Sequence, residues 1–271
     1  MKRVALVLTL AIMAWAAADP APNRLTAEEK RAGWILLFDG KTMAGWDDPR
    51  AKTPPGDAWS IDDGCLKAKA HPAITEDLFT KSTFRDFELA FQWRISPGGN
   101  SGLKYRIQDH WLVLPKPAGA PPERFEASVE RSFLNRTAER RAKGQDYVIG
   151  FEYQMTDDSA NGDSLGNNKH TAGALYDMAA PSAHATKPVG EFNQSRIVVR
   201  GKHVEHWMNG TQVVDAAMDS PGAMEGIATR WKSAPHVYEL LAKQPKIDCN
   251  ISLQNHGDEA WFRSIKIRRL Q

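Results

Sequence analysis

The chain has 271 residues and carries 35 basic against 33 acidic residues, which gives a formal net charge of +2. This near balance argues against a polyanionic partner such as nucleic acid, because nucleic-acid-binding proteins carry a clustered basic surplus. Two cysteines are too few for a disulfide-stabilised scaffold, and the length suits one large β domain or two small domains.

The first eighteen residues have the pattern of a secretory signal peptide. Lys2 and Arg3 form a basic start, residues 4–15 are apolar or small, and residues 16–18 are alanines suited to cleavage. The apolar run is shorter than the about 20 residues that a membrane-spanning helix needs, although an uncleaved N-terminal anchor is the alternative. We therefore expect a periplasmic or secreted protein with no membrane span after cleavage.

Cleavage after Ala18 would change the charge of the mature chain. It removes Lys2 and Arg3, so that 33 basic residues face 33 acidic ones. A neutral chain suits a small neutral ligand. Cys65 and Cys249 are both retained, and the sequence does not say whether they pair or remain as buried thiols.

After a polar segment at 19–32, expected to be a short helix or an arm, short strands alternate with turns. Asp63-Gly64 and Asn209-Gly210 lie between apolar runs, which is a strong hairpin signal. Many short strands at this spacing predict a sandwich, barrel or jelly roll. Strands are expected at residues 34–38, 59–61, 65–70, 87–95, 102–107, 151–156, 197–200, 203–208, 211–214, 251–256 and 261–270.

Two segments interrupt this pattern. Residues 111–149 read as an insertion that starts with a loop and continues as a helix, from Pro121-Pro122 to a stop at Gly144. Within it Phe125, Val129 and Phe133 recur at helical spacing. Residues 221–245 predict a helix packed beside the sheet.

A carboxylate and an amide share one face of the strand at 151–156. Glu152 and Gln154 alternate with apolar residues, so both point away from the core. A bulge after Gln154 would turn Asp157 to the same side, and without it Asp158 would lie there. The alternative is an edge strand with solvated charges.

Two further segments offer polar groups for a site. Lys104 and Arg106 share a strand face after the turn at Asn100, where they could hold a substrate oxygen or form a structural ion pair. Gln254 and His256 share a face as well, and histidine transfers protons near neutral pH. A purely structural histidine is the alternative.

Other chemical signals are weaker. The rings that could stack on a sugar are those of Trp93, Tyr176, Trp207 and Trp261, although most tryptophans are expected in the core. The histidines form no compact metal signature. Carboxylates near His256 could hold a divalent metal, but no ligand spacing marks a metal site and no cofactor is identified.

In order along the chain, several segments resemble the 3-keto-disaccharide hydrolase family, also described as 3-keto-glycoside lyase/hydratase domains. Phe192 stands where that family usually has tryptophan, and the insertion at 111–149 is longer than the usual connection. The resemblance implies an all-β, two-sheet concanavalin A-like jelly-roll sandwich over 33–271, with a helical insertion at 111–149. It rests on residues 37–46, 86–89, 99–106, 151–154, 157–158, 171–176, 190–193, 204–210, 251–257 and 262–263.

The same resemblance implies cleavage of glycosidic bonds in 3-keto-glycosides, with a small carbohydrate as partner. A keto group at C3 acidifies the C2 hydrogen, so a base can remove it and expel the C1 oxygen before water adds back. Glu152 or His256 is the expected base and Asp157 its partner. The expected substrate-binding residues are Asn100, Lys104, Arg106, Gln154, Tyr176, Asn193, Trp207, Asn209 and Gln254.

Two alternatives remain at this point. The fold also serves non-catalytic, lectin-like carbohydrate-binding modules. Related glucanases carry Glu-x-Asp-x-x-Glu, whereas this chain has Gln154 between Glu152 and Asp157, which makes a conventional β-glucanase the less favoured alternative. The sequence leaves the linkage, the anomer and the oligomeric state open.

Overall fold

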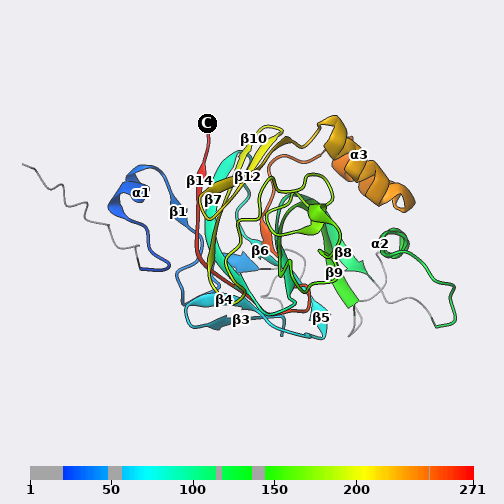
Figure 1. The fold of residues 1–271 in the computed structure, drawn as a ribbon, viewed down its shortest axis with the longest axis horizontal. Coiled ribbons are helices and arrows are strands. Elements are labelled where there is room, and N and C mark those ends of the chain that lie inside the picture. The colour runs from blue at the N-terminus through cyan, green and yellow to red at the C-terminus, as the bar shows by residue number, and fades with distance from the viewer. Residues whose placement is uncertain (1–20, 48–56, 114–117, 136–143, 244) are drawn as a thin grey trace, which may run out of the picture.

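The computed structural model describes residues 21–47, 57–113, 118–135, 144–243 and 245–271. Two sheets face each other in a jelly-roll sandwich, which confirms the expected concanavalin A-like fold. In Figure 1 the larger sheet, the smaller sheet and the helices α2 and α3 follow one another from left to right. The predicted signal peptide at 1–18 lies outside the described residues.

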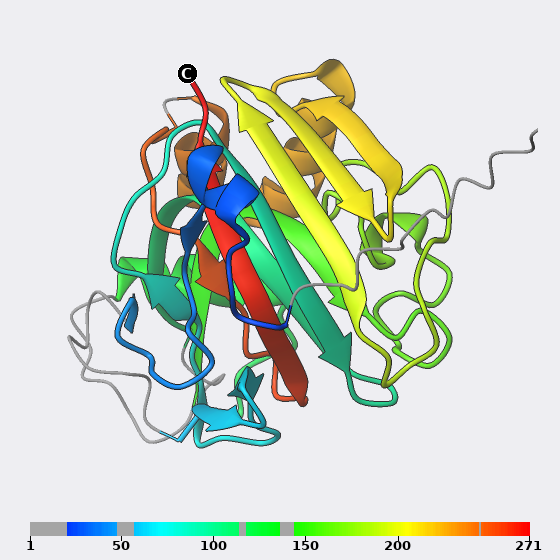
Figure 2. The same cartoon turned by 90° about the vertical axis from the view of Figure 1, so that its left-hand side faces the viewer.

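The larger sheet has eight strands and contains the hairpins that the Asp-Gly and Asn-Gly pairs predict. Its long strands run side by side in Figure 2, with α1 (Ala27–Arg31) packed in front of β14. Its order is β12 (Thr211–Ala217), β11 (His203–Met208), β10 (Asn193–Arg200), β7 (Phe87–Ile95), β14 (Ala260–Arg269), β4 (Cys65–Ala68) and β3 (Trp59–Asp62), with β1 (Ile35–Leu36) paired to β14.

The smaller sheet has six strands and carries the polar segments that the sequence singled out. Its central pair, β8 and β9, is antiparallel, whereas β5 joins β9 in parallel. The order is β2 (Trp46–Asp47), β6 (Leu78–Thr80), β13 (Ser252–Leu253), β8 (Asn100–Val113), β9 (Gly144–Thr156) and β5 (Ile74–Thr75).

The insertion is partly strand, which corrects the predicted boundaries. Strand β8 continues to Val113 and β9 begins at Gly144, because the two pair along this length and bury Trp111. Helix α2 (Phe125–Leu134) lies between them. It ends ten residues before Gly144, so the predicted helix stop there is wrong. Residues 136–143 are outside the described range.

The second predicted helical segment is two helices, α3 (Pro221–Arg230) and α4 (Pro235–Ala242), joined by η2 (Trp231–Ser233). Pro221 and Pro235 each stand in a first turn, where the missing N–H costs nothing. None of the described helices is long and apolar enough to cross a bilayer.

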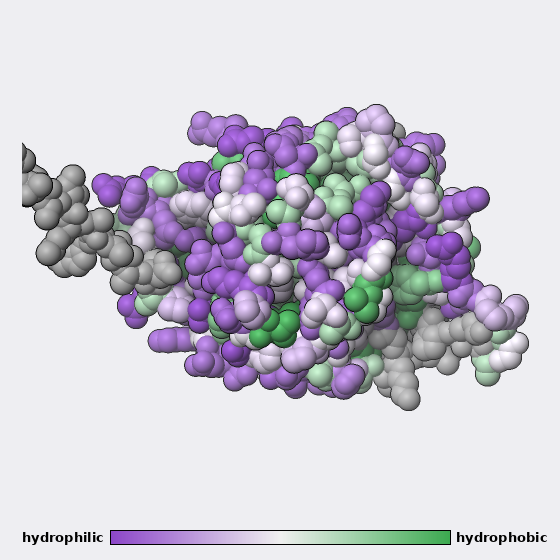
Figure 3. Space-filling view, viewed as in Figure 1, coloured by the Kyte–Doolittle hydropathy of each residue, from purple (hydrophilic) through white to green (hydrophobic). Residues whose placement is uncertain are grey.

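The core lies between the sheets and includes the inward face of β7, as its alternation predicts. Trp93 is buried there and donates from Nε1 to Ser195 Oγ at 2.8 Å, so it is a core residue and no sugar platform. Cys65 and Cys249 are both buried free thiols. Outside the core, the face shown in Figure 3 is mainly hydrophilic, with small hydrophobic areas scattered over it.

Candidate active site

Three neighbouring strands of the smaller sheet bring polar residues into two rows on the outward face. In one row Ser252 of β13 pairs with Lys104 of β8, which pairs with Glu152 of β9. In the next row Gly102 pairs with Gln154. Gln254 follows β13 directly and donates from its backbone N to Gly102 O at 2.8 Å.

The register confirms that Glu152 and Gln154 share a face, opposite the buried Phe151 and Tyr153. Gly102 leaves a gap in the row between the two glutamines. The carboxylate of Glu152 occupies it: a β-carbon built on Gly102 would lie 2.1 Å from Glu152 Oε1. Strand β8 therefore needs a glycine here to leave room for the Glu152 carboxylate.

A buried ion pair lies beneath this carboxylate. Lys104 is 2% exposed, and its Nζ lies 3.9 Å from both Glu152 Oε2 and Asp77 Oδ2. Burial lowers the pKa of Lys104, but Asp77 and Glu152 outweigh burial and raise it, so the amine stays charged. Burial raises the pKa of Asp77 to about 7, against the opposing effects of Lys104 and the Ser252 hydroxyl. A fixed cation thus faces Glu152 from below.

Amide groups surround the Glu152 carboxylate on the sheet. Gln154 donates from Nε2 to Asn100 Oδ1 at 3.3 Å. The Oε1 atoms of Gln154 and Gln254 are buried, and neither has a hydrogen-bond partner among the described residues. Buried acceptors without a partner are costly, so these two carbonyl groups are expected to receive hydrogen bonds from a ligand.

A cleft of about 940 Å³ opens above these residues. The strands form its floor, and its walls come from the loop after β9, from α2 and from α3. The volume is within the range of small-molecule sites. Six of the residues predicted for the site line it: Asn100, Glu152, Gln154, Tyr176, Gln254 and His256.

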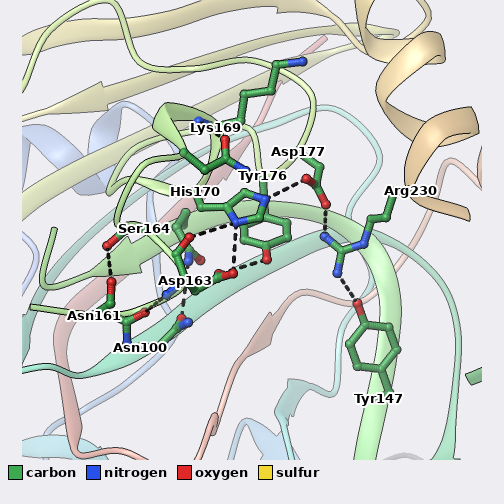
Figure 4. A network of polar contacts seen from close by, with 12 residues as sticks. Asn100, Tyr147, Asn161, Asp163, Ser164, Lys169, His170, Tyr176, Asp177 and Arg230 are labelled. Carbon is green, nitrogen blue, oxygen red and sulfur yellow. Dashed lines mark hydrogen bonds and ion pairs between the residues drawn. The ribbon is translucent and has the colours of Figure 1, made fainter. Parts of the chain in front are cut away.

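One wall is a network centred on His170, which the sequence gave no reason to select. His170 lies between two carboxylates, with Nδ1 2.9 Å from Asp163 Oδ1 and Nε2 2.7 Å from Asp177 Oδ1 (Figure 4). Burial opposes the charge of the ring, but the hydrogen bonds to Asp163 and Asp177 prevail and raise the pKa of His170 to about 9. The imidazole is therefore a cation at neutral pH and donates to both carboxylates.

Tyr176 and Arg230 complete this wall. The Tyr176 ring stacks on His170 at 4.2 Å between centroids, and its hydroxyl donates to Asp163 Oδ2 at 2.9 Å. Arg230, from α3, pairs with Asp177 and donates to the Tyr147 hydroxyl at 2.9 Å. The network ties the loop after β9 to both α3 and β9. It holds Tyr176 at a fixed position in the cleft.

Arg106 lies outside the cleft, which corrects the predicted face shared with Lys104. The register of β8 shifts between Tyr105 and Asp109, and Arg106 has a φ of 52° within the shift. Its guanidinium instead contacts Asp86 at 3.2 Å and the carbonyl of Gly201 at 2.8 Å. A bulge redirects the side chains that follow it, and strand alternation alone does not reveal one.

Asp157 is not turned toward Glu152 either. The pairing of β8 with β9 is regular from Tyr105↔Phe151 to Asn100↔Thr156, so the bulge expected after Gln154 is absent. Asp157 accepts hydrogen bonds from the backbone N of Gly98 and from the Ser159 hydroxyl, and so stabilises a turn. Asp158, the alternative, accepts from the backbone N of Ala172 at 2.8 Å and also lies outside the cleft.

Three other predicted binding residues belong to the larger sheet. Asn209 donates to Asn193 Oδ1 at 2.8 Å and to the carbonyl of Ala185, which fixes the β11–β12 turn. Trp207 donates from Nε1 to Glu205 at 2.7 Å, under the guanidinium of Arg196. None of the three lines the Glu152 cleft, because Asn193 and Trp207 lie on strands of the other sheet and Asn209 lies in the turn between two of them.

The structure also shows where Trp261 and His256 lie and whether the described residues could hold a metal ion. Trp261 lies on β14 of the larger sheet, beneath the guanidinium of Arg94. His256 is exposed at the rim of the cleft. Within the described part of the chain, no group of three histidine, cysteine, aspartate or glutamate side chains is arranged to hold a metal ion. The carboxylates closest to His170 already accept hydrogen bonds from that ring.

Comparison with known proteins identifies relatives of the whole domain. The family model described as "3-keto-alpha-glucoside-1,2-lyase-like domain" matches residues 33–268. A protein of Bacteroides thetaiotaomicron named "3-keto-disaccharide hydrolase" is 30% identical over 260 residues, covering 88% of this chain and 79% of that protein.

Solved structures support the same fold. A protein of Parabacteroides distasonis, whose name describes it as a predicted glycosyl hydrolase, matches this chain with a TM-score of 0.67 and 25% sequence identity. The match covers 93% of this chain and all of that one. A second protein from this organism, named in the same way, has a TM-score of 0.56 and 22% identity over 88% of this chain and 99% of its own.

Proposed function

Because this chain belongs to the 3-keto-α-glucoside-1,2-lyase-like domain family, we propose that it cleaves the glycosidic bond of 3-keto-glycosides by elimination and rehydration. The names of its relatives support the broader activity, hydrolysis of a glycosidic bond. The observation that carries the finer proposal is the Glu152 carboxylate. It lies over Gly102 between two glutamines whose carbonyl groups have no hydrogen-bond partner within the described part of the chain.

The carboxylates of the cleft favour elimination over ordinary glycoside hydrolysis. A conventional glycosidase needs two carboxyl groups that are both free to react. They act either as nucleophile and acid or as base and acid. Here Asp163 and Asp177 are engaged by His170, Tyr176 and Arg230, and Asp157 lies outside the cleft. Two further carboxylates line the cleft: Glu126, which pairs with Arg124, and Glu225 on the α3 wall. Glu152 is the carboxylate on the strand floor, and a single base there is what removal of an acidified C–H proton requires.

In the proposed reaction Glu152 removes the C2 proton of the 3-keto sugar. The C3 oxygen becomes an enolate, and the side-chain amide of Gln254, which lines the same cleft, would donate to it. Collapse of the enolate breaks the bond from C1 to the leaving oxygen, which takes a proton from His256 or from water. Glu152 exchanges its proton with the solvent, water adds at C1 and gives up a proton to His256 or to bulk water, and Glu152 then protonates C2. The net reaction is hydrolysis.

A buried lysine and two glutamines support the base. Lys104 is buried beneath the carboxylate, with its Nζ 3.9 Å from Glu152 Oε2, so it is a positioning residue. The carbonyl groups of Gln154 and Gln254 would accept hydrogen bonds from sugar hydroxyls and so orient the C2 hydrogen toward Glu152.

The direct test is incubation of the protein with 3-keto-trehalose in D₂O. We expect release of 3-keto-glucose with deuterium at C2 beyond the level exchanged without enzyme. Glu152→Gln should lower kcat by about 100- to 10,000-fold. Glu239→Gln, an exposed change on α4, is the matched control and should be silent.

Other outcomes identify the alternatives. Cleavage without excess C2 deuterium would overturn the elimination mechanism and favour direct displacement. Binding of 3-keto-trehalose without cleavage would overturn the enzyme proposal in favour of a lectin-like module. Release of reducing sugar from laminarin, with 3-keto-trehalose left intact, would identify a conventional β-glucanase.

A further inference from the structure

The insertion between β8 and β9 places an exposed aromatic ring on the wall of the cleft. Phe125 is the first residue of α2, and its side chain is 39% exposed. Of the large apolar side chains that the structure describes as exposed, Phe125 alone is aromatic and lines the cleft. The others are Ile35, Ile61, Leu134, Leu165, Val189 and Ile247.

The contacts that anchor α2 to the sheet are made by residues other than Phe125. Val129 is fully buried, its carbonyl accepts from Trp111 Nε1 at 3.1 Å, and Phe133 packs edge-on against Trp111 at 5.1 Å. These contacts fix α2 across β8. Phe125, one turn before Val129, adds its ring to the cleft wall.

Phe125 forms a corner with Tyr147 of β9. The rings meet at 74°, with centroids 5.0 Å apart, and both line the cleft. The Tyr147 hydroxyl is fixed by Arg230, and Lys104 Nζ lies 5.0 Å from the Tyr147 ring. Since Lys104 also faces Glu152 at 3.9 Å, this aromatic corner adjoins the proposed base.

Polar groups of the same wall surround the corner. Gln145 lies on β9, and Glu225 and Thr229 lie one turn apart on α3. An apolar ring face with hydrogen-bonding groups at its edges suits a cyclic molecule that carries hydroxyls. A simple alkyl group would cover neither ring and would reach few of these polar groups.

We propose that Phe125 and Tyr147 form a subsite for the leaving group, which selects 3-keto-glycosides whose leaving group contains a ring. The proposal rests on the proposed function for the position of the scissile bond. A second sugar is the ring that the polar surroundings favour, and an aryl group tests the aromatic contact by itself.

The test compares methyl and phenyl 3-keto-α-glucosides in the wild type and in Phe125→Ala. We expect Phe125→Ala to lower kcat/KM for the phenyl substrate about 5- to 10-fold and to leave the methyl substrate within twofold. Phe125→Tyr should retain the preference. Leu134→Ala, at the exposed end of the same helix, is the matched control and should change neither value. The same comparison with 3-keto-trehalose reports on a sugar as the leaving group.

Failure of the subsite and failure of the proposed reaction give different results. Equal losses on both substrates, or no change on either, would overturn the subsite. If the wild type cleaves neither of these substrates nor 3-keto-trehalose, the proposed function fails. The subsite is then tested by calorimetry, from the binding of unoxidised phenyl and methyl glucosides. Phenyl glucoside should bind more tightly than methyl glucoside, and Phe125→Ala should remove that difference; equal affinities in the wild type would overturn the subsite.

Discussion

The carboxylate of Glu152 lies where a side chain at Gly102 would have to be. The two residues are on adjacent strands, and a β-carbon at position 102 would come within 2.1 Å of Glu152 Oε1. Gly102 has no positive φ, so its backbone would accept other residues. Space for the neighbouring carboxylate is therefore the physical reason for a glycine here.

Gly102→Ala should consequently impair the reaction with little effect on the fold. The methyl group must displace the flexible end of Glu152, and a misplacement of about 1 Å can cost about 100-fold in rate. We expect kcat to fall about 10- to 100-fold on 3-keto-trehalose, with Tm changed by only a few degrees. Gly222→Ala on α3, where a β-carbon would meet no atom within 4 Å, is the matched control. Normal kcat in Gly102→Ala would argue against Glu152 as the base.

The His170 network makes a second prediction, which NMR can test. Hydrogen bonds to Asp163 and Asp177 raise the pKa of His170 from the ordinary 6.5 to about 9, so the ring should titrate near pH 9. Asp163→Asn removes one carboxylate and should move the midpoint toward 6.5. Stability from the charged ring is full below about pH 6.5 and is lost as pH rises toward 9.

The imidazole signals of the wild type, assigned with His170→Gln, provide the measurement. The wild type should also lose more stability toward urea between pH 6.5 and 9 than His170→Gln does. A midpoint near 6.5 in the wild type, or one unmoved by Asp163→Asn, would contradict the ion pair.

His206 makes the opposite prediction at acidic pH. It is fully buried between the Tyr105 hydroxyl, at 2.9 Å from Nε2, and the carbonyl of Gly173, which accepts from Nδ1 at 2.9 Å. Burial lowers the pKa of His206 to about 4, against the opposing backbone hydrogen bonds. Unfolding exposes a ring with the ordinary value of 6.5, so the unfolded state takes up more protons between pH 4 and 6.5. Stability should therefore fall as pH drops through this interval.

Urea unfolding at pH 6.5 and pH 4.5 measures this effect. The wild type should lose roughly 2–3 kcal/mol more than His206→Gln over this interval. His184→Gln, at an exposed position, serves as the control and should behave as the wild type does. Equal acid sensitivity of the wild type and His206→Gln would show that the buried ring is not responsible.

Much of the fold follows from periodicity and turn residues. The alternation in residues 87–95 predicts the buried face of β7, and Asp63-Gly64 lies in the turn of the β3–β4 hairpin. Period-two side-chain geometry also places Glu152 and Gln154 together on the floor of the cleft. These features depend on local geometry, which a sequence carries directly.

The rest of the site depends on contacts that sequence spacing does not record. Arg106 is redirected by a bulge in β8, and Asp157 accepts hydrogen bonds within a local turn. His170 meets its two carboxylates through a loop whose course has no repeating pattern. Bulges and irregular loops are set by tertiary packing, so their side-chain directions cannot be read from alternation.

The anchoring of α2 across β8 has a consequence for how new specificities could arise. The proposed base and its buried lysine belong to the sheet, whereas Phe125 belongs to a helix whose packing depends on Val129 and Phe133. Exchanges in the first turn of α2 therefore leave the sandwich core and the base in place. A small library at residues 124–126 would sample preferences for different leaving groups without the loss of stability that usually accompanies changes on a catalytic floor.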